Sequence, residues 1–184
     1  MNLEEAFAQN AFNTMLKAMP FRLQQKEDEF GRKLANSRLN TIGKLKVLYD
    51  FMDEFFGHVS DFTPCKKWCS YCCHYEVCVS EQEVKYIEKN TKYKRLKRPK
   101  VVIGGHGKPC PFLKNGACSI YDERPFVCRK HVVFRKSNVA CHPDVCFQNQ
   151  SIQLRLSGLE EAYASIIGNG GYPKLYDIRQ VFEA

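Results

Sequence analysis

The sequence predicts a mainly α-helical protein in which N- and C-terminal helices enclose a small, irregular, cysteine-rich centre with little sheet. Three observations lead to this prediction. Apolar residues recur at helical spacing in residues 1–60 and again in 149–184. All ten cysteines lie in the intervening residues 61–148, which also hold six of the eight prolines. The length of 184 residues suits one compact core, so we expect a single domain, 1–184, made of these three parts.

The N-terminal part is expected to form three helices. The first has apolar residues three and four apart and ends at Pro20: Leu3, Phe7, Ala11, Phe12, Met15, Leu16 and Met19. The second covers the more polar residues 21–37, anchored by Phe21, Phe30 and Leu34. The third follows the stripe Ile42, Leu45, Leu48, Met52, Phe55 and Val59.

In the middle part, Ser80-Glu81-Gln82-Glu83 is the pattern of a capping box, and it predicts a helix to about Lys97, before Pro99. Residues 101–103, Val-Val-Ile, are expected to form at most one short strand. The glycines that follow them precede no helix start, which excludes a dinucleotide-binding loop.

The C-terminal part is expected to contain two helices. Leu156, Leu159, Tyr163 and Ile166 follow helical spacing, Gly168–Gly171 form a loop, and Leu175, Ile178 and Phe182 indicate a final short helix.

The positive charge is concentrated in one segment. The chain carries a formal net charge of +8, and residues 85–100 hold eight basic and one acidic side chain, or +7 of it. Within this expected basic helix, a solvated face is one interpretation. The other is binding to nucleic acid or to an acidic protein through Lys92, Lys94, Arg95, Lys97 and Arg98.

The sequence favours a cytoplasmic protein without a membrane anchor. It has neither a basic start followed by an apolar run nor a stretch of about 18 apolar residues. In a reducing compartment, clustered thiols bind metal more often than they form disulfides.

The segment CKKWCSYCC places Cys65, Cys69, Cys72 and Cys73 within nine residues. Thiolates three or four residues apart can converge on one metal, whereas the side chains of the adjacent pair usually diverge, so the pair could serve two centres. Cys110, Cys118 and Cys128 each stand beside proline or glycine, in loops able to hold a rigid thiolate cage. The alternative, that so many cysteines are only small buried apolar residues, is disfavoured.

A second tier of candidate ligands lies farther along the chain. Cys141 and Cys146 flank His142, with His131 upstream, and could supply a separate zinc site or could simply be reduced thiols in a loop. His74 could be a ligand or a hydrogen-bond donor to one. Cys78, between Val77 and Val79, is expected to be a buried apolar residue.

CKKWCSYCC together with CPFLKNGACSIYDERPFVCR (Cys110 to Arg129) resembles the CxxCxxCC cysteine-cluster family of zinc- or iron-chelating domains. The resemblance implies that the seven cysteines Cys65, Cys69, Cys72, Cys73, Cys110, Cys118 and Cys128 bind an iron–sulfur cluster, of the 4Fe–4S type, or zinc. It also implies a bacterial source. Because the family includes flagellin lysine N-methylase, it further implies possible S-adenosylmethionine chemistry. The first spacing departs from the family motif, with three residues instead of two between Cys65 and Cys69.

Three functions follow as hypotheses. The first is a metal protein whose cluster has a chemical or sensing role, and the second is a zinc-stabilised module that binds nucleic acid or protein through the basic segment. The third is a methyltransferase-like enzyme, by family analogy only. Cys65-x3-Cys69-x2-Cys72 also matches the radical S-adenosylmethionine motif. Only 112 residues follow Cys72, without the repeated strands and helices of that barrel. No substrate-binding motif is present, so the sequence does not decide whether the protein is an enzyme.

Overall fold

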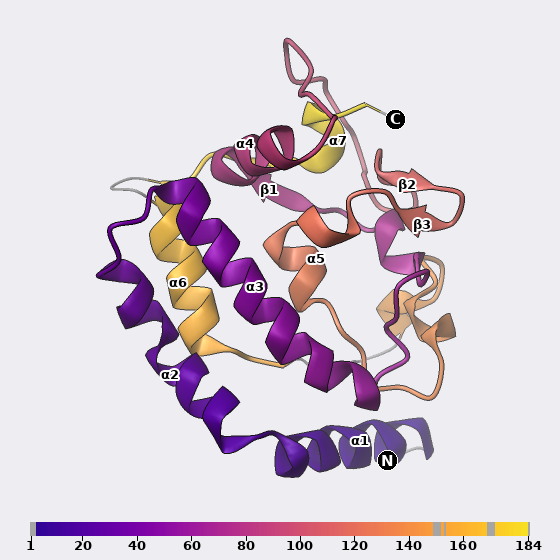
Figure 1. Ribbon diagram of the computed structural model, residues 1–184. Helices are drawn as coiled ribbons and strands as arrows, with labels where there is room; N and C mark the ends of the chain where they lie inside the picture. The colour runs from indigo at the N-terminus through magenta and orange to yellow at the C-terminus, as the bar shows by residue number, and fades with distance from the viewer. Residues whose placement is uncertain (1–2, 149–151, 153, 169–171, 184) are drawn as a thin grey trace.

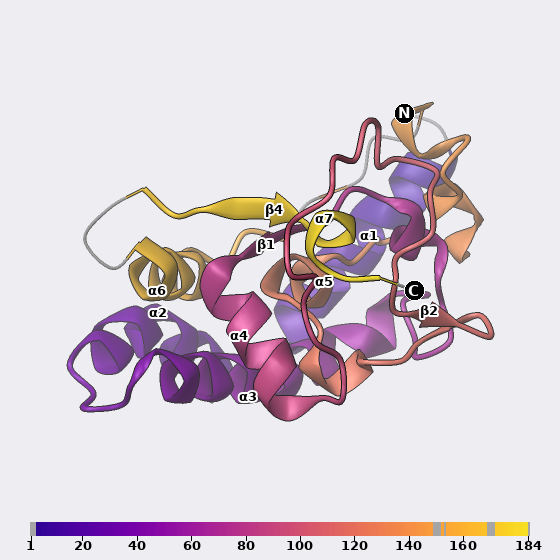
Figure 2. The same cartoon turned by 90° about the horizontal axis from the view of Figure 1, so that it is seen from above.

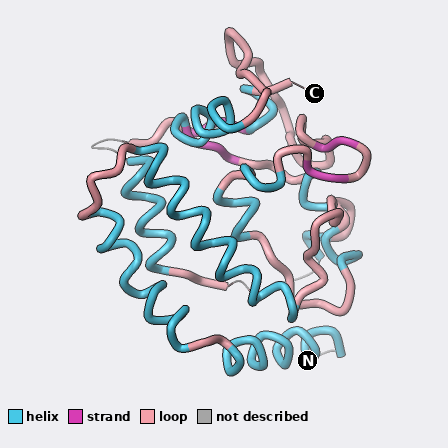
Figure 3. The backbone as a smooth tube through the Cα atoms, viewed as in Figure 1, coloured by secondary structure: helices cyan, strands magenta, loops and turns pink. Residues whose placement is uncertain are grey.

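The computed structural model describes residues 3–148, 152, 154–168 and 172–183. The predicted fold class is confirmed: these residues form seven α-helices and only two small sheets of two strands each. The long helices gather on one side, and the loops that carry the cysteines gather on the other (Figures 1 and 3).

The helical side is built from α1 (Leu3–Ala18), α2 (Phe21–Ala35), α3 (Thr41–Val59) and α6 (Ser157–Gly168). α6 packs against both α2 and α3, while α1 crosses one end of this layer (Figure 1). The apolar stripes read from the sequence meet in the larger of two cores, where Met15, Leu45, Met52 and Leu159 are fully buried. The three N-terminal helices are therefore confirmed.

α2 and α6 approach each other closely at Gly158. A Cβ atom at this position would lie 2.0 Å from the backbone oxygen of Glu27, so only glycine fits. The Glu27 carboxylate accepts a hydrogen bond from the Leu159 N–H at 3.1 Å, near the start of α6, and burial raises the pKa of this carboxyl group. Gly168 ends α6, and the rest of the predicted loop, 169–171, lies outside the described residues.

α4 (Glu81–Asn90) begins with the predicted capping box. The Glu83 N–H donates to Ser80 Oγ at 3.2 Å, and the Ser80 N–H donates to Glu83 Oε2 at 2.8 Å. Glu83 is buried and also accepts from Tyr49 Oη, Tyr163 Oη and the Phe126 N–H, at 2.9, 2.6 and 2.9 Å. One carboxylate thus connects α4 with α3, with α6 and with the short helix α5 (Phe126–Lys130).

Two short sheets hold the remaining segments. β1 (Cys78–Ser80) pairs antiparallel with β4 (Leu175–Asp177), with Val79 opposite Tyr176, and brings the C-terminal segment back to the centre. α7 (Ile178–Val181) follows directly, as Figure 2 shows. β2 (Leu113–Lys114) and β3 (Ala117–Cys118) form a hairpin around Asn115 and Gly116, both at positive φ, as a two-residue turn requires. The other short elements are 3₁₀ turns: Ser60–Phe62, Tyr71–His74, Tyr121–Glu123, Asn138–Cys141 and Cys146–Gln148.

The predicted helix over 81–97 is wrong beyond Asn90. Thr91 Oγ1 donates to the Ile87 carbonyl oxygen at 2.7 Å and ends α4. Downstream, Arg95 turns back to the helix, where its backbone N–H donates to Glu88 at 3.1 Å and its guanidinium pairs with Glu81 and Glu88, both at 2.8 Å. The segment therefore lies against α4 as a loop, because side-chain partners satisfy the polar groups that a longer helix would have paired.

Two further predictions need correction. Residues 101–103 form no strand and lie in an exposed loop, with Val101 and Ile103 85% and 83% accessible to solvent. At the C-terminus, Leu175 belongs to β4 and the final helix covers only Ile178–Val181, because pairing with β1 provides partners for the backbone of residues 175–177.

A second, smaller core lies between α4, α7 and the loops of the middle part. It contains Val79, Val84, Phe112, Ile120 and Phe182, and the side chains of Cys110, Cys118 and Cys128 pack against it. The cysteine-bearing region therefore has an apolar core of its own. Among the described residues, no helix combines the length and apolar character required to cross a membrane.

Candidate metal centre

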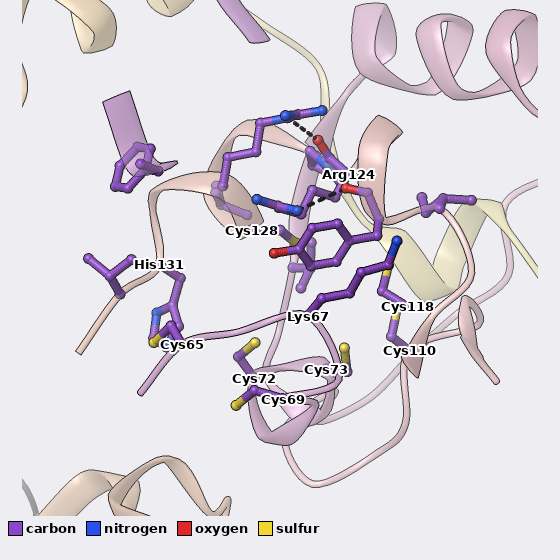
Figure 4. Close-up of a pocket in the computed structure, with 18 of the residues that line it drawn as sticks. Cys65, Lys67, Cys69, Cys72, Cys73, Cys110, Cys118, Arg124, Cys128 and His131 are labelled. Carbon is purple, nitrogen blue, oxygen red and sulfur yellow. Dashed lines mark hydrogen bonds between the residues drawn. The ribbon is translucent and has the colours of Figure 1, made fainter. Parts of the chain in front are cut away.

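Eight of the ten cysteines border one cavity of about 560 Å³. They come from five segments of the chain: Cys65, Cys69, Cys72, Cys73, Cys110, Cys118, Cys128 and Cys141. Figure 4 shows seven of these thiols around a common space, with His131 beside Cys65. All ten cysteines are free thiols. The structure thus brings together the seven cysteines implied by the family resemblance and adds Cys141.

Two consecutive turns shape the first cysteine segment. The Cys69 N–H donates to the Lys66 carbonyl at 3.0 Å, and the Cys73 N–H donates to the Ser70 carbonyl at 2.9 Å. Within the first turn, Trp68 has a φ of +81°, which is unfavourable for a bulky side chain. These turns direct four thiols toward the cavity within nine residues.

Four thiols form what we call the inner thiol group: Cys73, Cys110, Cys118 and Cys128. Burial is the main cause of a raised pKa at Cys110, Cys118 and Cys128, and neighbouring thiols add to it. For Cys128 those neighbours are Cys110, Cys118 and Cys73. The pKa of Cys110 reaches about 12. Without a cation these thiols stay protonated at neutral pH.

Backbone pairing assembles the inner thiol group from four segments. The Cys110 N–H donates to the Cys73 carbonyl at 2.7 Å, and the Gly107 N–H donates to the His74 carbonyl, also at 2.7 Å. The β2–β3 hairpin then places Cys118 opposite Leu113, and α5 supplies Cys128. Pro125, which precedes α5, has a φ of −59°, suited to the start of a helix.

The remaining thiols, Cys65, Cys69, Cys72 and Cys141, form the outer thiol group. Burial raises the pKa of Cys141 to about 12, with contributions from Cys65, Cys69 and Cys146. Cys72 lies where the two groups meet, because a hydrogen bond with it is the main cause of the raised pKa of Cys73. The adjacent pair therefore contributes one thiol to each group.

Arg179, which the sequence analysis did not single out, connects the loops behind the inner thiol group. This buried guanidinium donates to the carbonyls of Cys73, Tyr75, Lys108 and Pro109 at 3.2, 2.9, 2.6 and 3.2 Å. Its charge lowers the pKa of Cys73 and of Cys110, against the larger effects that raise both. No local motif identifies this residue, because the carbonyl groups to which it donates belong to residues 70 to 106 positions away.

Arg129, which borders the cavity, has a similar role. It is 2% exposed, pairs with Asp53 of α3, and donates to the carbonyls of Asp122 and Arg124, the latter at 2.9 Å. Its guanidinium also lies 4.4 Å from the centre of the Tyr49 ring. Arg129 thereby joins the cysteine region to the helical layer.

The second-tier candidate ligands do not all lie at the same cavity. Cys141 belongs to the main cavity, whereas Cys146 borders a separate cavity of about 460 Å³, with its sulfur 3.9 Å from His106 Nε2. His131 borders both cavities. Burial lowers the pKa of its ring, and its Nε2 atom is buried without a hydrogen-bond partner among the described residues. His142 borders neither and lies 3.5 Å from Asp144.

Two other residues considered in the sequence, Cys78 and His74, do not border the main cavity. Cys78 is exposed, so the prediction that it is a buried apolar residue is wrong; in β1 its side chain points away from the face that buries Val79. His74 has a buried Nδ1 without a hydrogen-bond partner among the described residues, but it does not border the main cavity.

The donor set suits a thiophilic metal or an iron–sulfur cluster, because thiolates are the ligands that zinc and iron–sulfur clusters prefer. Among the described residues, no three histidine, cysteine, aspartate or glutamate side chains come together closely enough to hold a single ion as they stand. The thiols line a cavity instead of converging on one point.

Comparison with protein families agrees with this geometry. Residues 64–147 match the family model CxxCxxCC, described as "Putative zinc- or iron-chelating domain". No curated protein and no solved structure matches the chain. The matched range contains every cysteine of both thiol groups. The resemblance to the CxxCxxCC family, inferred from the cysteine motifs, is thus confirmed over residues 64–147.

Proposed function

We propose that this protein binds an iron–sulfur cluster of the 4Fe–4S type on the inner thiol group, with the outer thiol group bordering the same cavity. The observation that carries the proposal is that four partly buried thiols from four segments border one cavity, where neighbouring thiols help to raise the pKa of Cys110, Cys118 and Cys128. Four cysteine thiolates are the usual ligand set of such a cluster.

The size of the cavity favours a cluster over a single zinc ion. One zinc takes four ligands at about 2.0–2.3 Å and leaves little space among them. Here eight thiols border about 560 Å³, twice the number of ligands that one zinc needs. When bound, a cluster supplies electron transfer or, at an open iron, a Lewis acid. The residues around it bury the thiols, and Arg179 and Arg129 fix the loops that carry them.

Anaerobic purification followed by metal analysis and an absorbance spectrum tests the proposal. We expect iron and sulfide with a broad visible band. Zinc without that band would contradict the iron–sulfur assignment and support the zinc alternative. Protein without either metal would contradict the function as a whole.

Serine variants test which thiols bind the metal. Cys110→Ser and Cys128→Ser should lose most of the bound metal, because a serine hydroxyl stays protonated where a bound thiol does not. Cys78→Ser is the matched control and should keep full metal content, since Cys78 is exposed. Cys65→Ser and Cys141→Ser report on the outer thiol group: a partial loss with the spectrum retained would indicate a second centre there.

Alkylation of the unmodified protein provides a test that does not depend on folding of the variants. With metal bound, iodoacetamide should label Cys78 but not Cys73, Cys110, Cys118 or Cys128, as read by mass spectrometry. Equal labelling of the inner thiol group with and without metal would contradict the assignment.

A second candidate function is binding of nucleic acid or of an acidic protein through the basic segment. It is supported by the exposure of Lys92, Lys97 and Arg98, for which no ion pair is found among the described residues. Lys94 and Arg95 are less suited to this role, because both bond to Glu88 of α4. No observation on the described residues favours an S-adenosylmethionine site, so methyl transfer is not part of the proposal.

A further inference from the structure

The wall of the main cavity is not formed by thiols alone. Lys67 and Arg124 also border it, and both lie over the ring of Tyr121: Lys67 Nζ is 5.5 Å and Arg124 Cζ 3.8 Å from the centre of that ring. In Figure 4, Lys67 extends between the Cys72–Cys73 pair and Arg124, with Cys110 and Cys118 near one end. Two cations are thus held beside the thiols by a neutral aromatic ring.

These two cations are only partly neutralised by the protein. Lys67 has no carboxylate within ion-pair distance among the described residues. The Arg124 guanidinium lies 3.9 Å from Asp53, whose carboxylate is engaged more closely by Arg129. One Arg124 nitrogen donates to the Tyr121 carbonyl at 3.0 Å, which fixes the plane of the guanidinium and leaves other N–H groups available.

Most of the other charged groups on the wall have partners of their own, as Asp53 and Arg129 have each other. Lys66 donates to the Ser60 carbonyl, and Glu76 accepts from the Gly105 N–H at 3.0 Å. The carboxylates Asp53, Glu76 and Asp122 are outnumbered by the cations Lys66, Lys67, Arg124 and Arg129. An anionic group that enters the cavity near Lys67 would therefore meet hydrogen-bond donors.

We propose that Lys67 and Arg124 bind the oxyanion group, carboxylate or phosphate, of a small molecule that enters the cavity beside the thiols. A planar guanidinium and a flexible ammonium are the usual pair of donors for such a group. The inference deepens the proposed function and rests on it for the metal that the small molecule would meet. A competing role for the two cations is to balance the charge of metal-bound thiolates, and the experiment separates the two.

The test is isothermal titration calorimetry on the metal-loaded protein under anaerobic conditions. One arm uses inorganic phosphate, the other succinate, each compared with chloride at the same ionic strength. We expect saturable binding in one arm, which identifies the source of the oxyanion. Lys67→Gln should weaken this binding at least tenfold with unchanged metal content. Arg124→Lys, which keeps the charge but loses the planar fork, should weaken it as well.

Lys92→Gln is the matched control, because Lys92 also lies over a tyrosine ring, 5.7 Å from the centre of Tyr93, but does not border the cavity. It should bind the anion like the wild type. Absence of saturable binding in both arms would overturn the inference, as would wild-type affinity in Lys67→Gln. Loss of metal from Lys67→Gln with unchanged anion affinity would assign the cations to charge balance. Metal content, measured on the same samples, distinguishes failure of the proposed function from failure of this inference.

Discussion

At the scale of single residues, Arg179 illustrates how a buried cation can organise an irregular region. Its guanidinium donates to four carbonyl oxygens that belong to two loops, 73–75 and 108–109, and pairs with Asp177 at 3.2 Å. Loops without regular secondary structure need such partners, because a buried carbonyl without a donor is costly.

Arg179→Met should therefore lower the free energy of unfolding by about 3 kcal/mol, the cost of leaving buried polar groups and one carboxylate without their partner. It should also weaken metal binding, because Cys73 and Cys110 lie on the two loops. Urea denaturation and metal analysis are the measurements. Arg38→Met, the same change at an exposed position, is the control and should change stability by less than about 0.5 kcal/mol. Equal effects of the two substitutions would contradict this role for Arg179.

At the scale of elements, the basic side chains of residues 91–100, which follow α4, are of two kinds. Arg95 is 31% exposed at its side chain and pairs with two carboxylates of α4, whereas Lys92, Lys97 and Arg98 extend into solvent. Cations of equal charge in the sequence thus have different roles, one in holding the loop and the others in any interaction with a partner.

We expect Arg95→Gln to lower stability by about 1 kcal/mol, since two partly exposed ion pairs are lost. The triple change of Lys92, Lys97 and Arg98 to glutamine should leave the melting temperature unchanged. If the wild type binds nucleic acid, the triple variant should lose that binding and its salt dependence. Thermal denaturation and binding titrations at several salt concentrations provide the measurements. Nucleic-acid binding that is insensitive to salt would contradict an electrostatic interface.

At the scale of the whole molecule, the two cores differ in what supports them. The larger core is closed by α1, α2, α3 and α6, whereas the smaller one is covered by short elements and by loops that carry the inner thiol group. Metal binding contributes to folding free energy, on the order of 10 kcal/mol for structural sites. We therefore expect the smaller core to be the part that depends on metal.

Chelation under reducing conditions should lower the melting temperature sharply while most of the helical circular dichroism persists at low temperature, because the larger core contains no cysteine among the described residues. Calorimetry and circular dichroism, repeated after metal is restored, check both parts of this expectation. An unchanged melting curve in protein shown to be free of metal would contradict it.

The sequence by itself determined the features that depend on neighbours along the chain. The apolar stripes of α1, α2, α3 and α6 follow from helical spacing, and the start of α4 follows from the hydroxyl and carboxyl side chains of Ser80 and Glu83. The family resemblance, carried by the local cysteine motifs, named seven of the eight cysteines that border the main cavity. The end of α4 was missed, since the contacts of Arg95 with Glu81 and Glu88 form only once the chain has turned back.

Only the tertiary structure decided how the thiols are grouped. Cys72 and Cys73 share a hydrogen bond where the two thiol groups meet, and Cys141 joins the main cavity while Cys146 does not. Cys78 is exposed because the pairing of β1 with β4 fixes which face of that strand is buried. Arg179 and Arg129 act on backbone groups far away in the chain. Such contacts depend on packing between segments, and the residue types of one segment do not encode them.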